Sequence, residues 1–383
     1  MLCTKTEKKS PFVWGNPLLK IKRRNASSKT WFCHVLPKII SLCQLFGLFP
    51  LNLVTSVSSA ENNLQNAKAT CIFEKNVIHE YKAKFFSFPS TMNILAFCIY
   101  AFYTGWTYFN IFNTLGRSLH GVVLYTLGIQ TQTLYIQVVV MTLFARWKSR
   151  QFSKGWMHLM ATHRRLIGRN EVLPRVLQQL RSYAVVTLAV IIVGTAGYMV
   201  TFTWFIILPC LRGKGNLSCK LFNHPLGHKI SHLFVVIYYQ MFCALFLHIC
   251  LTIKGLHVHL ASKLKSVLED EPINLLSHGC TSERRCKQIE ALRLTHERLC
   301  KATECFGRFF GVPAMFIIFS AFVSITCGIY TVIVATFRYE GKLRFSISQY
   351  VVWSFHSYFG FLTLSVILAA GQLVKSAVNF ENS

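Results

Sequence analysis

Lys287–Phe337 reads KQIEALRLTHERLCKATECFGRFFGVPAMFIIFSAFVSITCGIYTVIVATF, and this stretch decides the fold. In its first half, apolar side chains recur every three or four positions and therefore share one helical face. Opposite charges four positions apart, as in Glu297–Lys301 and Glu304–Arg308, favour a helix in water. Charge disappears from Phe309 onward. A continuous helix would be about 76 Å long, of which about 30 Å fits in hydrocarbon, so the first half must stand outside the bilayer.

The apolar seam of this first half is a candidate assembly surface. We expect it to join subunits through four residues: Ile289, Leu292, Leu299 and Phe306. The alternative is that the seam packs within its own subunit, against residues 254–270. Gly311 and Pro313 follow the point of entry into the membrane and predict a kink there.

Composition also indicates a membrane protein. The 383 residues are 52% hydrophobic and only 14% charged, which is too apolar for an ordinary soluble domain. The net charge of +27 lies in blocks between apolar spans and comes without a nucleic-acid-binding motif, so we expect a lipid bilayer and no nucleic acid as partner. The 14 cysteines are scattered and do not form a disulfide framework.

We predict an all-α, polytopic membrane helical bundle with intracellular helix extensions. Residues 1–90 form a cytoplasmic N-terminal segment with an interfacial or re-entrant helix near 36–57, residues 91–373 form the bundle, and 374–383 form a short cytoplasmic tail. Six apolar stretches are long enough to cross. They cover residues 91–113, 119–145, 184–209, 230–253, 309–337 and 348–373.

Basic residues set the expected orientation. One set of alternate segments holds 33 of the 41 Lys and Arg residues, so we place that side and the N-terminus in the cytoplasm. An outer loop then contains a glycosylation sequon at Asn216, flanked by Cys210 and Cys219 as candidate disulfide partners. If residues 36–57 crossed instead, the chain would have the seven spans of a G-protein-coupled receptor, but the basic residues 1–31 would lie outside, against the charge rule.

No enzyme chemistry is predicted. His158 with His163, and His257 with His259, lack the companions that a metal site needs, so we expect no metal, no cofactor and no catalytic residue. The spans contain no Asp or Glu, which weakens a membrane transporter driven through carboxylates without excluding it.

The outer halves of the spans carry aromatic, amide and imidazole groups suited to a small organic molecule, although such residues also anchor helices at interfaces. The predicted ligand-binding residues are Tyr125, Gln130, Tyr198, Trp204, His232, Tyr238, Tyr239, Tyr330, Trp353 and His356.

Three motifs, in order along the chain, resemble the insect gustatory receptors. Leu45–Pro50 resembles the Gly-[Leu/Val]-Phe-Pro element before the first span, and Phe144–Lys148 resembles the basic exit of the second. Leu292–Phe310 and Tyr330 resemble the fifth helix. The family's seventh-helix string, Thr-Tyr, five apolar residues and Gln-Phe, does not occur in the given sequence.

The resemblance implies a seven-transmembrane chemoreceptor of the plasma membrane of chemosensory neurons. It implies a subunit of a tastant-gated, non-selective cation channel, assembled as a homo- or hetero-tetramer with other gustatory receptor subunits. Because that family's seventh helix lines the pore, the resemblance leaves open whether the given sequence is a truncated gene product. It predicts no current from this chain by itself.

Overall fold

The computed structural model describes residues 39–45, 47–48, 50–57, 77–83, 87–115, 121–167, 175–204, 208, 226–269, 280–337 and 347–379. Most of this part of the chain is helical, and it also contains one pair of strands. The strands are β1 (Leu51–Val57) and β2 (Val77–Ala83), and the helices are α2 (Phe88–Leu115), α3 (Gly121–Trp147), α4 (Ser149–Ile167), α5 (Arg175–Phe202), α8 (Leu226–Glu269), α9 (Cys280–Phe337) and α10 (Ile347–Asn379).

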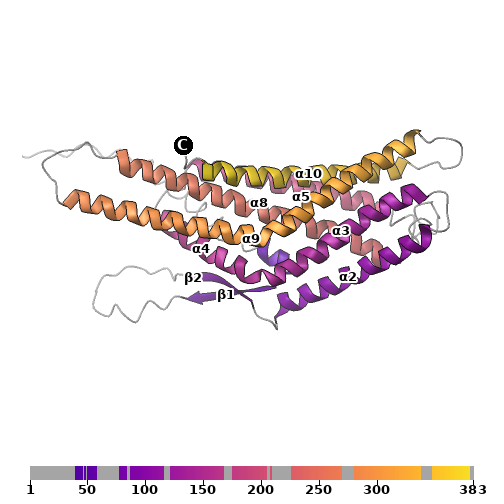
Figure 1. Cartoon of the computed structure of the whole chain (residues 1–383), viewed down its shortest axis with the longest axis horizontal. Coiled ribbons are helices and arrows are strands. Elements are labelled where there is room, and N and C mark those ends of the chain that lie inside the picture. Colours follow the sequence, from indigo (N-terminus) through magenta and orange to yellow (C-terminus); the bar gives the residue numbers. More distant parts are fainter. Residues whose placement is uncertain are drawn as a thin grey trace, which may run out of the picture.

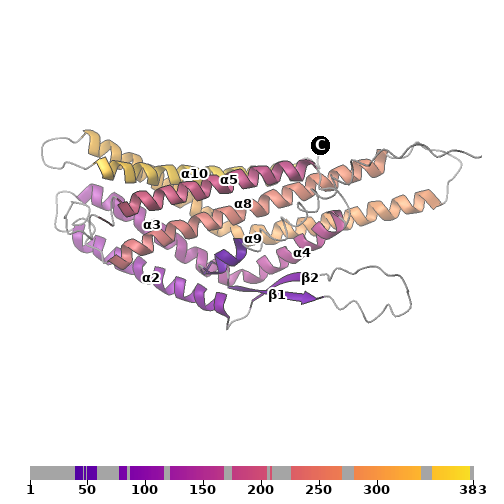
Figure 2. The same cartoon turned by 180° about the vertical axis from the view of Figure 1, so that it is seen from behind.

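The helices run along the long axis of the molecule and divide it into two parts (Figures 1 and 2). One part, here called the charged layer, consists of α4, residues 254–269 of α8 and residues 280–308 of α9. The other part, the apolar bundle, contains α2, α3, α5, α10 and the remaining parts of α8 and α9. The all-α membrane bundle is thereby confirmed as the fold class. Among the described residues, three helices are long and apolar enough to cross a membrane, within Phe234–Glu269, Arg285–Ile333 and Ser357–Lys375.

α9 belongs to both parts. Its 58 residues run without interruption from the charged layer into the apolar bundle, with Pro313 inside the helix. A proline within a helix removes one backbone hydrogen bond and bends the axis. Figure 1 shows α9 changing direction near its middle, as the sequence predicted.

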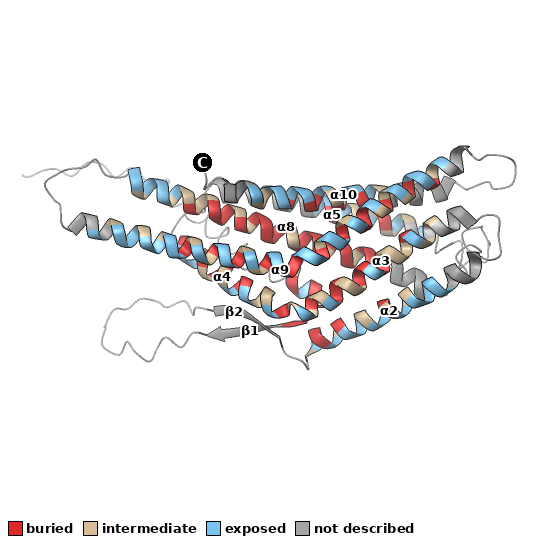
Figure 3. Cartoon of the chain, viewed as in Figure 1, coloured by how far each residue is buried: buried red, intermediate tan, exposed pale blue. Residues whose placement is uncertain are grey.

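The two parts are joined by a cluster of phenylalanine rings, here called the aromatic junction: Phe152 of α4, Phe242 of α8, and Phe306, Phe309 and Phe310 of α9. The ring of Phe152 lies 5.1 Å from that of Phe309, and the ring of Phe242 lies 5.3 Å from that of Phe310. All five side chains are buried. Figure 3 shows that buried residues follow α8, which runs through the middle of the molecule.

The segment predicted as one helix near 36–57 is different in the structure. Its helix covers residues 39–45 and is capped by Gly47, whose φ of +76° is accessible to glycine at little cost. The Leu48 amide donates to the Cys43 carbonyl (2.7 Å) and the Gly47 amide to the Gln44 carbonyl (3.0 Å), the hydrogen bonds of a Schellman cap.

The chain then continues as a strand instead of a helix. β1 pairs antiparallel with β2, from Leu51 opposite Ala83 to Val57 opposite Val77. A helix is disfavoured here because Pro50 cannot continue one and because Val54, Thr55 and Val57 are β-branched. The paired strand β2 lies in the polar segment 58–90, where the sequence indicated no strand.

The Gly47 turn is held inside the bundle by side chains from two helices. Asn93 of α2 donates to the Gly47 carbonyl (2.7 Å), and the Tyr238 hydroxyl of α8 donates to the same oxygen (3.1 Å). A Cβ atom on Gly47 would lie 2.5 Å from the Met92 carbonyl oxygen, so no other residue fits. The Gly-Leu-Phe-Pro element therefore positions α2 against α8.

Candidate ligand-binding site

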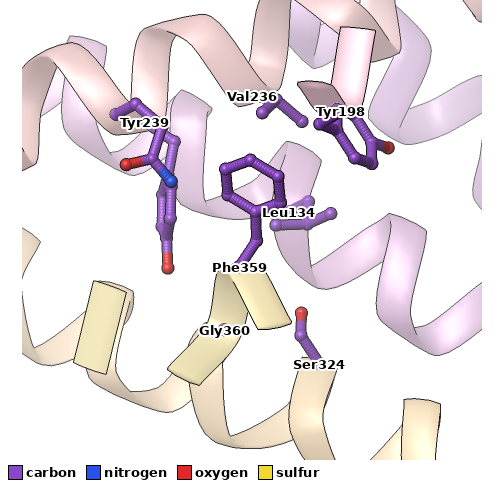
Figure 4. Close-up of a pocket in the computed structure, with 8 residues that line it drawn as sticks. Leu134, Tyr198, Val236, Tyr239, Ser324, Phe359 and Gly360 are labelled. Atoms are coloured by element: carbon purple, nitrogen blue, oxygen red, sulfur yellow. The ribbon is translucent and has the colours of Figure 1, made fainter. Parts of the chain in front are cut away.

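Five helices meet at a small cavity in the apolar bundle (Figure 4). Its volume is about 30 Å³, enough for one or two water molecules. The lining residues come from α3, α5, α8, α9 and α10, so a change in the shape of the cavity involves five helices. They are Leu134, Tyr198, Val236, Tyr239, Gln240, Ser324, Phe359 and Gly360.

The shape of the cavity is set by one aromatic ring and one glycine of α10. Figure 4 shows the ring of Phe359 between Tyr198 and Tyr239. It meets Tyr198 edge to face, with ring centroids 5.1 Å apart and planes inclined by 77°. At Gly360, a Cβ atom would lie 2.9 Å from Ile325 of α9, so the missing side chain is what lets the two helices approach.

The polar groups among the described lining residues are uncharged. Gln240 donates through its Nε2 to the Thr363 hydroxyl (3.3 Å), and Tyr239 contributes a hydroxyl to the lining. Ser324 contributes a further hydroxyl, which points into the cavity in Figure 4. Aromatic faces with a few hydroxyl and amide groups suit a neutral, partly apolar molecule.

Two of the predicted ligand-binding residues, Tyr198 and Tyr239, line this cavity. Gln130 is buried on α3, one turn before the lining residue Leu134, and its Nε2 has no hydrogen-bond partner among the described residues. Because a buried amide without a partner costs free energy, this group favours a water or a ligand atom beside it.

Three other predicted residues lie elsewhere. Tyr238 is buried but faces the Gly47 turn, and its ring contacts that of Tyr100 at 6.0 Å. Trp204 and Tyr330 lie on the surface of the bundle, 64% and 40% exposed, as expected of residues that contact lipid. No further role for them follows from their positions.

The remaining predicted residues cannot be placed. The side chains of Tyr125, His232, Trp353 and His356 lie outside the described residues, as do Asn216, Cys210 and Cys219.

Sequence reasoning missed most of the cavity. Leu134, Val236, Phe359 and Gly360 resemble any other apolar residue of a span, and their convergence depends on how five helices pack. The only local signal is the helical spacing of Val236 and Gln240, which places them on one face of α8.

The predicted assembly seam is partly internal. Leu299 and Phe306 are buried within their own chain, where Phe306 packs on Phe152 of α4 at 5.5 Å. The partner helix within the chain is mainly α4, whereas the alternative to subunit assembly had named residues 254–270. Ile289 and Leu292 are half-buried and keep some exposed apolar surface.

No group of three His, Cys, Asp or Glu residues suited to a metal ion occurs in the part of the chain that the structure describes. The long apolar helices and the charged extension of α9 define the class: a multi-pass helical membrane protein. The chain matches the 7tm chemosensory receptors over residues 38–379. It therefore belongs to that family, which is one of receptors and not of enzymes. No curated protein matches the chain.

Proposed function

We propose that this chemoreceptor is a gustatory receptor subunit, part of a tastant-gated cation channel in the plasma membrane of chemosensory neurons. The observation that carries the proposal is the uncharged cavity in which residues of five helices converge. Family membership supplies chemoreception. A ligand that separates Phe359 from Tyr198 would change the packing of α10 on α5.

The proposed ligand is a neutral molecule with an apolar part and a hydrogen-bonding group, and because the cavity has room for only one or two water molecules, Phe359 and Tyr198 must move apart to admit it. It would stack on Tyr198 or Phe359 and bond to Tyr239, Gln240 or Ser324. A carboxylate or ammonium ligand is disfavoured, because none of the described residues that line the cavity carries a charge to offset its desolvation.

A route from this cavity to the charged layer runs along α9. Ser324 lines the cavity, and the same helix continues through the aromatic junction at Phe309 and Phe310 into the charged layer. A packed helix of this kind transmits a displacement from one end to the other, provided that it can pack against its neighbours in two discrete positions.

The experiment replaces Tyr239 by Phe and, separately, Ser324 by Ala. A panel of neutral sugars and uncharged bitter compounds is applied to cells that express the chain with other receptor subunits. We expect about a fivefold higher half-maximal concentration, since one hydrogen bond contributes about 1 kcal/mol. The same ligand should raise the unfolding temperature of the purified chain.

The matched control is Tyr330→Phe, which removes the same hydroxyl from an exposed position. Equal responses of the Tyr239, Ser324 and Tyr330 variants would place the ligand elsewhere. Accumulation of the compound in vesicles without current would favour a transporter instead.

We also propose tetramer assembly through the exposed part of the α9 seam, with the N-terminus in the cytoplasm. Ile289→Asp with Leu292→Asp should abolish oligomers in detergent, while Asn216 still receives its glycan. Leu299→Asp serves as the contrast, because its burial predicts a loss of folding. An oligomer that survives the double change would exclude this contact.

Topology separates the proposal from a G-protein-coupled receptor. A tag at the N-terminus should be reached by antibody only after the cells are permeabilised. Asn216→Gln should remove a glycosidase-sensitive band, while Asn25, which also lies in a sequon, should remain unmodified. Staining of the tag in intact cells, or a glycan at Asn25, would overturn the orientation.

A further inference from the structure

The elbow between α3 and α4 gathers four basic residues within nine positions. α3 is free of charge from Gly121 to Ala145, and Arg146, Lys148, Arg150 and Lys154 then follow. The chain turns at Lys148, whose amide donates to the Phe144 carbonyl (2.8 Å). In the whole sequence, no Asp or Glu occurs between Glu80 and Glu171.

These cations lie at the level where the apolar bundle ends. Two helices give that level independently. On α3, charge begins at Arg146. Gly155 of α4 lies beside Cys305 of α9, because a Cβ atom added to Gly155 would lie 3.1 Å from Cys305. The apolar part of α9 begins about one turn after Cys305, at Phe309. Lys154, next to Gly155, is thus about one helical turn from the boundary, within the depth of lipid headgroups.

In the part of the chain that the structure describes, three cations of the elbow lack a carboxylate partner. Among the described residues, Lys148, Arg150 and Lys154 form no ion pair, whereas cations of α9 such as Lys287 and Arg293 each pair with a glutamate. Lys148 instead lies 4.5 Å above the ring of Trp147, which is 67% exposed at the same level. A basic residue beside an exposed tryptophan is typical of a membrane interface.

The backbone of the elbow is anchored to neighbouring helices on both sides of the turn. Arg146 donates to the Ser90 hydroxyl in the first turn of α2 (3.1 Å). The opposite face of α4 is fixed by the buried side chains of Phe152, Trp156 and Leu159. Arg150 and Lys154 are four positions apart and share the exposed face.

Nearby groups report the same positive potential. The pKa of His158, one turn after Lys154, is lowered by partial burial and then by Lys301, Arg298 and Lys154. Lys301 is paired with Glu297, whereas Lys154 adds an unpaired positive charge at this point, which makes the surface attractive to a multivalent anion.

We propose that Lys148, Arg150 and Lys154, with Trp147 beside them, form a binding site for the headgroup of a phosphoinositide lipid. Clusters of four to eight Lys and Arg residues directly after a membrane span are typical of such lipid sites, and the elbow holds four when Arg146 is included. Arg150 can contact a phosphate through two N–H groups, and the two lysines add point charges. The site rests on the orientation proposed above, because phosphoinositides lie in the cytoplasmic leaflet, but not on the identity of the tastant.

The test uses the purified full chain in detergent micelles and a fluorescent short-chain phosphatidylinositol 4,5-bisphosphate as probe. Lys148→Gln with Arg150→Gln and Lys154→Gln should weaken binding about 100-fold. The matched control, Lys265→Gln with Lys287→Gln and Arg293→Gln, removes the same charge from ion-paired positions and should change affinity less than about twofold. An equal loss in both variants would overturn the site in favour of net charge alone.

Two competitors identify the anion. Phosphatidylserine at equal total charge should displace the probe poorly, and effective displacement would show only a diffuse anionic surface. Soluble inositol trisphosphate should compete less well than the lipid, and equal competition would replace the lipid with a soluble phosphate. Should the triple variant unfold, Arg150→Gln with Lys154→Gln changes only exposed side chains and must still weaken binding at least tenfold.

Discussion

The two halves of α9 share one continuous helix but are stabilised in different ways. Residues 280–308 expose charged side chains that pair along the helix, as Lys301 does with Glu297, and bury a narrow stripe against α4. Residues 309–337 carry no charge and expose large apolar side chains such as Phe319 and Phe322. The exposed side chains of the first half are most stable in water and those of the second half in lipid. The membrane boundary therefore lies where the two halves of α9 meet.

Truncation of a ring at the aromatic junction should have the largest effect. Phe306→Ala removes a buried side chain between α4 and α9, and we expect it to lower the free energy of unfolding by about 3–5 kcal/mol. Phe319→Ala, on the exposed face of the second half, should change it little. Chemical denaturation of the chain in micelles measures both, and equal losses would contradict the distinction between the halves.

Close approach of α9 and α10 should be the next most sensitive feature. A Cβ atom at Gly360 would lie 3.0 Å from the Ala321 carbonyl oxygen, so Gly360→Ala should destabilise by about 1–3 kcal/mol. Gly371→Ala, on the same helix, meets no atom within 4 Å and should stabilise by about 0.5–1 kcal/mol. Opposite shifts in unfolding midpoint are expected, and shifts of the same sign would show that the backbones can separate.

Protonation should affect the charged layer. Burial, and then Arg164, lowers the pKa of His163 to about 4. The folded state thus favours neutral His163, and the unfolded chain takes up its proton first as the pH falls below about 6.5. Stability should drop by about 2 kcal/mol between pH 7.5 and pH 5 because of this group. His163→Gln should remove that part of the loss, and an unchanged pH profile would show that other groups cause it.

Surface ion pairs should matter least. Glu297→Gln breaks the pair with Lys301, but both side chains are about half exposed and screened by salt. We expect no resolvable change in unfolding midpoint at physiological salt and a small decrease at low salt. A large decrease at high salt would show that the pair takes part in a packed contact.

Much of the architecture follows from the sequence alone. The boundary at Phe309, the helix on either side of it and the kink near Pro313 are local properties, since they depend on charge spacing, hydrophobicity and the missing proline amide. The family was also recognisable from short motifs, such as Leu45–Pro50, whose glycine is required by a positive φ.

Tertiary packing decided the rest. The strand pair β1–β2 was missed because β2 lies in a polar segment without a distinctive pattern. Its extended conformation is stabilised by pairing with β1, which is distant in sequence. The buried stripe of α9 includes Thr295 and Ala302, which hydrophobicity alone would not select. The cavity around Phe359 exists because five helices meet there. A spacing of 3.6 residues tells which side chains share a face, but only the packed bundle determines what that face meets.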